Sequence, residues 1–458
     1  MMVPEDLIRS LQNLHGFDEK AFRQVHLSGD PPASIRLNTS KWAKAAMPFD
    51  ALAEPVPWSV FGRYLPARPV FTLDPLLHAG AYYVQEASSM FLEQAIKSIA
   101  DKKEPMVALD LCAAPGGKST HLLSLLPQAS VLVSNEVIQS RVPILLENLV
   151  KWGDPHTIVT QNDPADFGKM GPLFDVMVVD APCSGSGLFR RDPGAIGEWS
   201  LQAVEHCSRR QQRILADALP ALKAGGHLIY ATCSYSPAED EQVVDRLQSA
   251  FGLQGVDLAW PDGEHGVVVT RAGRSGIPCY RFFPDRVKGE GFFMAVLQKQ
   301  GDENPGPIRA KPHRGKMTEF PDPIRNWLIS ADDLRFFQHK DACYAMPPKV
   351  LEFFTQLRSL LTIRKAGVKI AEEVHRQFNP VHDLALSYPL NRDAFQWVDV
   401  SKEQALSFLR KDEFALPAGA QKGWAVVAYQ GFPLGWVKHL GNRSNNYYPK
   451  DWRIRMKG

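Results

Sequence analysis

The stretch LDLCAAPGGKST, residues 109–120, marks the point where a buried strand gives way to a helix. An apolar run ends here, a Pro-Gly-Gly turn follows, and helix-forming residues come next. Glycine lets the backbone approach a ligand closely, and the first turn of a helix presents unpaired N–H groups. Ligands of open parallel sheets bind at the carboxyl ends of strands, where this turn lies. An ordinary strand-to-helix turn explains Pro-Gly-Gly equally well, and the departure from GxGxxG argues against a nicotinamide dehydrogenase.

Outward from this turn, short apolar runs alternate with helix-like stretches between about residues 106 and 300. The runs that we expect to be buried strands are Met106–Leu111, Val131–Ser134, Thr157–Thr160, Val176–Asp180 and His227–Thr232. The stretches that we expect to be helices are Lys118–Leu126, Ile138–Trp152, Leu201–Leu222 and Glu239–Phe251. Such alternation predicts βαβ units and a parallel sheet in an α/β fold. Two later runs, Tyr280–Phe283 and Gly291–Leu297, predict a strand pair that closes this sheet.

The chain divides into four regions by composition. We expect a small accessory domain over residues 1–75, a catalytic domain over 76–300, a linker and intermediate domain over 301–385, and a small β domain over 386–458. The boundary near residue 301 rests on GDENPGPIRAKPHRGKMTEFPDP, which is rich in Pro, Gly and charge and has no apolar periodicity. Beyond it, Val350–Ile363 predicts an amphipathic helix, and Gly423–Val437 predicts two short strands around a turn.

Composition restricts the class of protein. The chain has 458 residues, of which 45% are hydrophobic and 22% charged, as in ordinary globular proteins of several domains. A net charge of +2 is too small to indicate nucleic-acid binding, so that case must rest on local patches. The six cysteines form no CxxC pair, which argues against a zinc cluster, and we expect no metal. The sequence shows no secretory signal pattern and no apolar run of about 18 residues, which predicts a cytoplasmic protein without membrane contact.

Two acidic residues follow expected strands at the same edge of the sheet. Glu136 comes directly after the second strand, where a carboxylate can accept hydrogen bonds from ribose hydroxyls. An acid that interacts with the dipole of the next helix is the alternative interpretation. Asp163 follows the third strand and is placed to accept a hydrogen bond from an adenine amino group.

Two thiols also follow expected strands. Cys183 lies in DAPCSGSG, residues 180–187, and Cys233 lies in ATCSYSP, 50 residues later. A buried cysteine is usually a small apolar filler, but both of these lie in loops beyond strand ends. Because the two strands are expected to be neighbours, both thiols should point into one cleft. Coincidence is the alternative.

The segments CAAPGGK, DAPCSGSG and TCSYSPAEDE together resemble the Nop/Sun (Fmu) family of RNA cytosine-5 methyltransferases. GAYYVQEASSM (80–90), RLNTS (36–40) and GFFMAVLQK (291–299) fit the same family, so the resemblance covers residues 30–300. The segment Tyr429–Lys450 resembles the PUA-like tail of bacterial RsmF-type enzymes, which modify 16S ribosomal RNA. The resemblance implies a Rossmann-like class I methyltransferase sheet, dependent on S-adenosylmethionine, with an N-terminal accessory domain and a C-terminal PUA-like β domain, both RNA-binding.

The resemblance also implies roles for four side chains. C5 of cytosine is a poor nucleophile, and a thiolate that adds to C6 activates it. The family uses the cysteine of the TCS motif, which implies Cys233 as nucleophile and Cys183 as the thiol that helps release the product. Asp180 would hydrogen-bond the cytosine edge, and Lys118 would contact the active-site loop or stabilise charge there. DNA cytosine-5 methyltransferases use the cysteine of a Pro-Cys motif, which would instead nominate Cys183.

The implied cofactor is S-adenosylmethionine, and the implied partner is RNA, specifically 16S rRNA in the small ribosomal subunit, with the protein acting as a monomer. The residues expected to bind the cofactor are Cys112, Ala113, Ala114, Pro115, Gly116, Gly117, Lys118, Glu136, Arg141, Asp163 and Asp180. For Arg141, a surface helix arginine is the alternative interpretation.

The residues expected to contact RNA are Arg36, Arg190, Arg191, Tyr448 and Lys450. Arg190 and Arg191 directly follow the Cys183 loop, and further basic clusters lie at Arg209–Arg213 and Ile308–Lys316. Charge runs are usually solvated faces, and the aromatics of the tail could equally form the core of a small β domain. Two functions remain as alternatives: cytosine-5 methylation of tRNA, and a catalytically silent RNA-binding assembly factor. The presence of Cys233, Cys183 and Asp180 argues against the silent factor.

Overall fold

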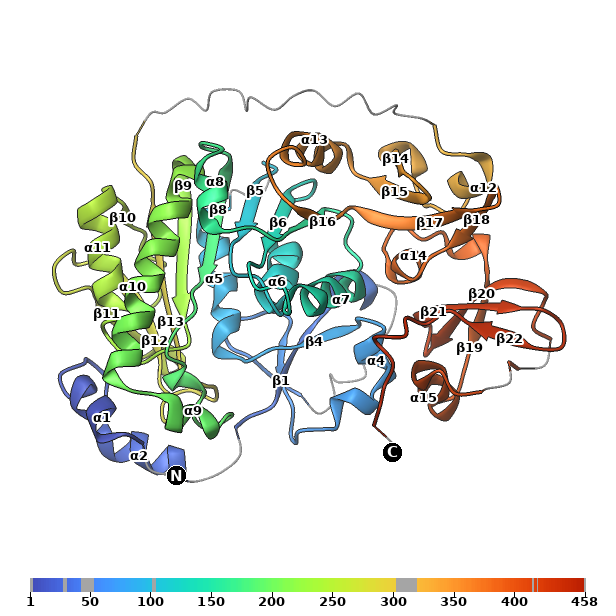
Figure 1. Cartoon of the computed structure of the whole chain (residues 1–458). Helices are drawn as coiled ribbons and strands as arrows, with labels where there is room; N and C mark the ends of the chain where they lie inside the picture. Colours follow the sequence, from blue (N-terminus) through green and yellow to red (C-terminus); the bar gives the residue numbers. More distant parts are fainter. Residues whose placement is uncertain are drawn as a thin grey trace.

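A ten-stranded sheet forms the centre of the computed structural model, which describes residues 3–27, 31–42, 53–100, 104–301, 319–413, 416–417 and 419–456 (Figure 1). Its parallel strands lie in the order β9-β8-β5-β6-β7. Their bounds are β5 (Val107–Asp110), β6 (Val131–Asn135), β7 (Thr157–Thr160), β8 (Phe174–Asp180) and β9 (Leu222–Thr232). The expected parallel sheet is thereby confirmed.

Antiparallel strands extend the sheet beyond β9. In spatial order these are β13 (Phe292–Gln298), β12 (Pro278–Phe282) and β11 (Val268–Arg271), with the short β10 (Gln254–Gly255) also beside β13. The expected strand pair is β12 with β13, and it joins the sheet through the pairing of β13 with β9.

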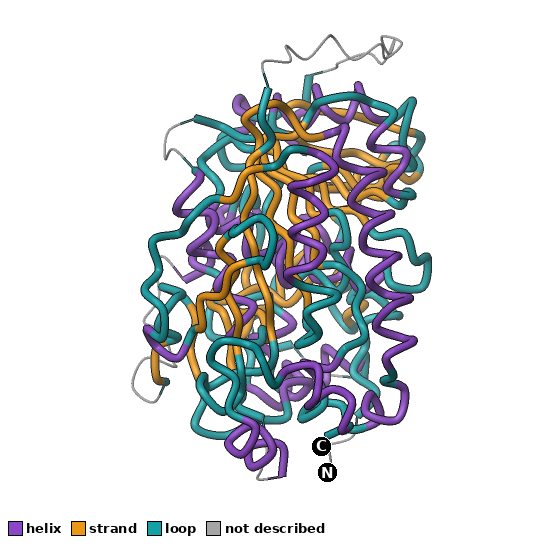
Figure 2. Tube along the Cα trace, turned by 90° about the vertical axis from the view of Figure 1, so that its left-hand side faces the viewer, coloured by secondary structure: helices purple, strands orange, loops and turns teal. Residues whose placement is uncertain are grey.

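Helices cover both faces of this sheet, as Figure 2 shows with strands running between helices. One face packs on α5 (Leu92–Ile99) and α6 (Gly117–Leu125), with α7 (Val142–Trp152) beside α6. The other face packs on α8 (Pro164–Gly168), α10 (Leu201–Ala218), α11 (Glu241–Phe251) and α13 (Pro348–Leu357). Side chains of β5 alternate between the two cores, with Val107 and Leu109 on one face and Ala108 on the other. Burial on both faces explains why these strands are apolar almost throughout.

At the opposite edge of the sheet, β16 (Ile363–Ala366) pairs antiparallel with β7. The expectation of one helix over Val350–Ile363 is therefore wrong at its C-terminal end, since α13 stops at Leu357. The β-branched Thr362 and Ile363 favour extended backbone, and the open edge of β7 offers them hydrogen-bond partners.

Three four-stranded sheets flank the central one. The N-terminal sheet contains β1 (Ser34–Leu37), β2 (Glu54–Pro55), β3 (Gly62–Tyr64) and β4 (Tyr82–Val84). A second sheet contains β14 (Arg335–His339), β15 (Ala342–Met346), β17 (Val368–Val374) and β18 (Gln377–Pro380). The C-terminal sheet contains β19 (Gln396–Asp399), β20 (Gly423–Tyr429), β21 (Phe432–His439) and β22 (Ser444–Asn446), in which β20 and β21 are the expected strand pair.

The remaining α-helices are short. They are α1 (Glu5–Leu11), α2 (Glu19–Leu27), α3 (Thr39–Trp42), α4 (Pro75–His78), α9 (Gly194–Glu198), α12 (Asp322–Arg325), α14 (His382–Leu386) and α15 (Lys402–Arg410). Within the ranges given above, no helix has the length and apolarity needed to cross a bilayer. The same residues contain no group of three or more potential metal ligands.

A buried ion cluster fixes the start of α11 against the antiparallel edge. Arg281 of β12 is 1% exposed; its Nη2 lies 2.5 Å from Glu241 Oε2 and 3.0 Å from Asp240 Oδ2, and its Nη1 donates to the Tyr235 carbonyl. Burial alone would lower the pKa of Arg281, but the charges of Glu241 and Asp240 raise it above its usual value. The guanidinium therefore stays charged, and α11 is held where the Cys233 loop enters it.

We expect Arg281→Met to destabilise the fold by about 3–5 kcal/mol, because it leaves two buried carboxylates without their cation. Urea unfolding followed by circular dichroism measures this free energy. A loss below about 1 kcal/mol, the usual worth of an exposed pair, would contradict the buried cluster.

Candidate active site

The loops that follow β8 and β9 bring two thiols together at the carboxyl edge of the sheet. Asp180, the last residue of β8, is in register with Ala231 of β9, so both loops leave the sheet at the same height. The Sγ atoms of Cys183 and Cys233 lie 2.9 Å apart. The expectation that both thiols point into one cleft is confirmed.

These thiols line a cavity of about 550 Å³ at the ends of the parallel strands. Of the residues expected to bind a cofactor, six line it: Cys112, Ala114, Glu136, Arg141, Asp163 and Asp180. Ala113 and Pro115–Gly117 belong to the turn that connects β5 to α6. Gly116 in this turn has a φ of +113°, in the left-handed region. A cavity of this size is within the range of roughly 300–1,000 Å³ typical of small-molecule sites.

An ion pair lies beside the thiols. Lys118, in the first turn of α6, places Nζ 2.7 Å from Asp180 Oδ2 and 5.3 Å from the centre of the Phe292 ring. Burial alone would lower the pKa of Lys118, but the charge and hydrogen bond of Asp180, with Asp110 nearby, raise it. Lys118 therefore carries a fixed positive charge at the floor of the site.

The surroundings of Cys183 change its acidity. The hydrogen bond with Cys233, together with burial, raises the pKa of Cys183 well above that of a free thiol. A thiol that keeps its proton at neutral pH can donate it to a neighbouring thiolate. The 2.9 Å contact itself allows either sulfur to be the donor.

Glu136 and Arg141 form the far side of the cavity. Glu136 is 2% exposed, and its Oε1 accepts from the Ile138 amide. Among the described residues, Oε2 has no hydrogen-bond partner, and it lies 3.5 Å from Arg141 Nη1. Arg141 also donates to the Ala114 carbonyl. Asp163 caps α8 by accepting from the Ala165 amide at 3.0 Å. Glu136 therefore lines the cavity with one carboxylate oxygen that has acceptor capacity left.

Glu239 is a buried carboxylate that accepts hydrogen bonds from both cysteine loops. The sequence did not predict a role for it. It accepts from the Ser184 amide at 2.7 Å, from Ser184 Oγ at 2.6 Å and from Ser234 Oγ at 2.6 Å. Burial raises the pKa of Glu239, although hydrogen bonds from Ser184 and Ser234 lower it in part. The signal available in the sequence was its place in the acidic AEDE run. Arg210 and Arg213 of α10 also line the cavity, and only their basic cluster marked them beforehand.

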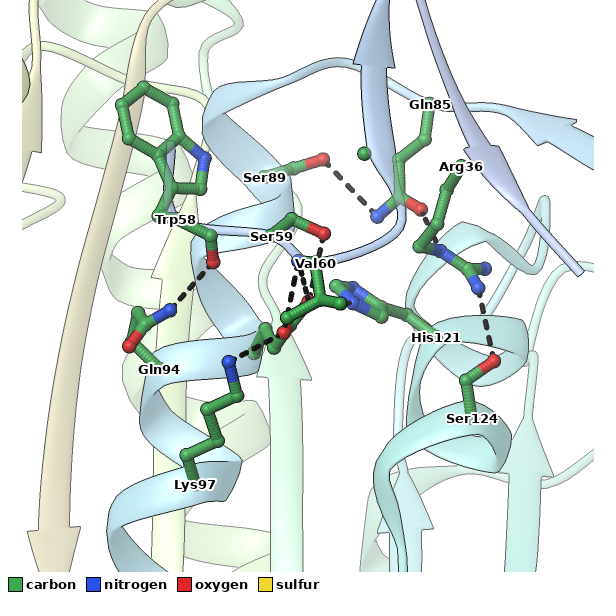
Figure 3. A network of polar contacts seen from close by, with 12 residues as sticks. Arg36, Trp58, Ser59, Val60, Gln85, Ser89, Gln94, Lys97, His121 and Ser124 are labelled. Carbon is green, nitrogen blue, oxygen red and sulfur yellow. Dashed lines mark hydrogen bonds and ion pairs between the residues drawn. The ribbon is translucent and has the colours of Figure 1, made fainter. Parts of the chain in front are cut away.

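Arg36 is placed differently from the expectation that it contacts RNA. It is fully buried and donates to Gln85 Oε1 at 2.7 Å and to Thr120 Oγ1 at 2.7 Å. Figure 3 shows its guanidinium reaching from the N-terminal sheet towards α6, where Ser124 lies. Burial lowers the pKa of Arg36 to about 9. The prediction of an RNA contact is wrong, because no polar atom of this side chain faces solvent.

Tyr448 is likewise 1% exposed, with its ring 5.6 Å from that of Phe408, so it belongs to the core of the C-terminal domain and cannot stack on RNA. Arg190 donates to the Gly289 carbonyl, and its side chain is only 8% exposed, so it holds a loop instead of presenting a surface cation. Arg191 and Lys450 are exposed. The basic cluster Ile308–Lys316 lies outside the described residues.

The sequence matches known protein families and relatives over most of its length. Family models match residues 3–87 (N-terminal domain of 16S rRNA methyltransferase RsmF), 98–298 (16S rRNA methyltransferase RsmB/F) and 395–454 (methyltransferase RsmF PUA domain). The ribosomal RNA small subunit methyltransferase F of Shewanella sp. strain MR-7 is 31% identical over 448 residues, 91% of this chain and 90% of that one. This chain belongs to the RsmF family. The Shewanella woodyi protein of the same description is 29% identical over 446 residues, again covering 91% and 90%.

Solved structures share the central fold. A methyltransferase homologue from Pyrococcus horikoshii has a TM-score of 0.51 at 26% identity and covers 65% of this chain and 100% of its own. The structure of NSun6 from Pyrococcus horikoshii with SFG has a TM-score of 0.53 at 20% identity, covering 65% and 99%. The Rossmann-like methyltransferase sheet expected from the sequence is thus shared with these structures, and the N-terminal and PUA domains match the family models.

We expect Glu239→Gln to loosen the two cysteine loops. The glutamine amide nitrogen is a donor, and it would replace a carboxylate oxygen that now accepts hydrogen bonds from Ser184 and Ser234. Alkylation of Cys183 by iodoacetamide, followed by mass spectrometry, should be about tenfold faster, as for a loss of roughly 1.4 kcal/mol in loop closure. Glu205→Gln, at an exposed position of α10, is the matched control. Equal alkylation rates in the two variants would show that Glu239 does not hold the loops.

We expect Arg36→Met to cost about 2–3 kcal/mol of stability, since buried acceptors on Gln85 and Thr120 lose their donor. Thermal unfolding and RNA-binding titrations below the unfolding transition separate the two roles. Weakened RNA binding at unchanged stability would restore Arg36 as an RNA contact.

Proposed function

We propose that this protein, acting as a monomer, transfers a methyl group from S-adenosylmethionine to C5 of a cytosine in 16S rRNA, with Cys233 as covalent nucleophile. The observation that carries the proposal is the Cys183–Cys233 contact at 2.9 Å, beside the Lys118–Asp180 ion pair, on one cavity. Membership of a family of ribosomal RNA methyltransferases supplies the reaction class.

The residues around the cavity fit S-adenosylmethionine. The unbonded Oε2 of Glu136 is suited to ribose hydroxyls, and Asp163 at the end of β7 is suited to an adenine amino group. When bound, this group supplies a methyl on a positively charged sulfur. The carboxylates at the cavity favour that positive charge, and Arg141 holds both Glu136 and the Ala114 carbonyl in place.

The chain's own groups account for activation of the cytosine. The Cys233 thiolate adds to C6, and the electron pair of the C5–C6 bond becomes available at C5 to form the bond to the methyl carbon as the bond between that carbon and the donor sulfur breaks. A general base then takes the C5 proton, the C5–C6 double bond re-forms, and the Cys233 thiolate leaves. Asp180, fixed by Lys118, is placed to hydrogen-bond the cytosine edge where charge develops.

The raised pKa of Cys183 disfavours this thiol as the nucleophile. Cys183 keeps its proton because its pKa is raised by the hydrogen bond with Cys233 and by burial, whereas a nucleophilic thiol must first lose its proton. The same proton on Cys183 can be returned to the Cys233 sulfur when the adduct breaks, which accounts for a role in product release. The Pro-Cys alternative, with Cys183 as nucleophile, requires a thiol whose pKa is raised to ionise first.

We expect Cys233→Ala to lower methyl transfer by about 10³-fold or more, as removal of a covalent nucleophile does. The measurement is incorporation of radiolabelled methyl into deproteinised 16S rRNA, assembled small subunits and bulk tRNA, with 5-methylcytosine identified after digestion. Cys183→Ala should instead accumulate a covalent RNA–protein complex on denaturing gels.

The outcomes separate the alternatives. A complex that accumulates in Cys233→Ala would reverse the two roles. Label in tRNA only would keep the chemistry and discard the ribosomal substrate, and no label in any RNA would favour a silent assembly factor.

A further inference from the structure

A second cavity, of about 270 Å³, lies between α13, the β14–β15 hairpin and β16. Three aromatic rings line it, those of Phe337, Tyr344 and Phe354, and we call it the aromatic–arginine pocket. The other side chains on its wall are His339, Met346, Arg358, Leu361, Ile363, Arg364, Lys365 and Ala366. Its volume is below the roughly 300–1,000 Å³ of common small-molecule sites, which suits one planar ring system better than a whole cofactor.

Arg358 lines this pocket and carries an unsatisfied donor. Its guanidinium carbon lies 5.4 Å from the centre of the Phe354 ring and 5.8 Å from that of Phe337. Its Nη1 is buried and has no hydrogen-bond partner in the part of the chain that the structure describes. A buried donor without an acceptor is costly, so a ligand atom that accepts from Nη1 would be stabilised there.

The charge of the pocket is positive. No Asp or Glu is among its lining residues, whereas Arg358, Arg364 and Lys365 are. Lys365 Nζ forms an ion pair with Asp383 Oδ2 at 2.8 Å, and Arg364 donates to Gln161 Oε1. Both cations are therefore fixed in place. A positive, aromatic-lined pocket is complementary to a nucleotide, which combines a π face with a negative backbone.

The pocket lies on the edge strand next to the proposed active site. β16 pairs with β7, and the Thr362 amide donates to Asn162 Oδ1. One residue further along the chain, Asp163 lines the cofactor cavity. The segment Gln161–Asp163 therefore joins the two sites directly, and an RNA strand that leaves the catalytic cavity along this edge meets the pocket.

We propose that the aromatic–arginine pocket binds one unstacked base of the RNA strand that flanks the target cytosine, which rests on the proposed function in taking RNA as the substrate. The base stacks on the rings, and Arg358 Nη1 donates to an acceptor on its edge. Guanine, with the O6 and N7 acceptors that arginine pairs with in nucleic acids, fits this donor best. The backbone of that nucleotide lies towards Arg364 and His339.

The test uses the full chain and fluorescein-labelled, U-rich RNA hexamers that carry one central guanosine, adenosine or cytidine. Phe354→Leu keeps an apolar side chain but removes the ring, and Arg358→Gln removes the donor. Arg376→Gln is the matched control, since it removes the same charge from the exposed β17–β18 turn. Thermal unfolding establishes that all variants fold.

We expect Phe354→Leu and Arg358→Gln to bind the guanosine hexamer about fivefold or more weakly, the lower end of what one stacked base contributes. Arg376→Gln should bind as the unaltered protein does, and Arg358→Gln should lose the preference for guanosine. In methylation assays the same two variants should raise KM for RNA and leave kcat unchanged.

Equal hexamer affinities across all variants would overturn the inference, even if methylation of rRNA is observed. Pocket-dependent hexamer binding by a protein that methylates no RNA would support the pocket and overturn the proposed function. A pocket variant that loses kcat but not RNA affinity would also overturn the inference, because the pocket would then act on the catalytic cavity and not on the RNA.

Discussion

The parallel pairing of β8 with β9 is the constraint on which the site depends. Because Asp180 and Ala231 are in register, the loops that carry Cys183 and Cys233 leave the sheet side by side. A shift by one residue would turn every side chain of a strand to the opposite face, so burial of both faces of the sheet secures this register. The thiol contact therefore depends on core packing along the two strands, and the cores on both faces of β8 hold the two cysteine loops in place.

Around the thiols, several ionisable groups have charged or hydrogen-bonding partners. Asp180 faces Lys118, Glu239 faces two serines, and Arg281 faces a pair of carboxylates at the start of α11. Preorganised groups of this kind need little rearrangement when charge develops during a reaction. The site combines a rigid charged floor with two small, Gly- and Ser-rich loops that leave room for a planar base.

Local patterns were enough to predict the central strands, the β12–β13 pair, the β20–β21 pair and the meeting of the two thiols. These features depend on alternation of apolar runs and on which strand ends share an edge, both of which are readable along the chain. Arg36 and Tyr448 were misjudged because their burial depends on partners from distant segments, such as Thr120 of α6 for Arg36. β16 and Glu239 were not predicted for the same reason. The open edge of β7 and the hydrogen bonds from two separate loops both depend on segments that are far apart in the sequence.

The joining of the first and last sheets has a consequence for how the molecule is made. Ile35, Leu37 and Tyr82 of the N-terminal sheet share one hydrophobic core with Val398 and Leu434 of the C-terminal sheet. During synthesis, the N-terminal strands emerge from the ribosome more than 300 residues before their packing partners do. Contacts between segments so far apart form late, and the apolar face of the early sheet stays exposed until then. Maturation of this enzyme is thus tied to completion of its chain, and a truncated product would carry an uncovered apolar surface that chaperones and proteases recognise.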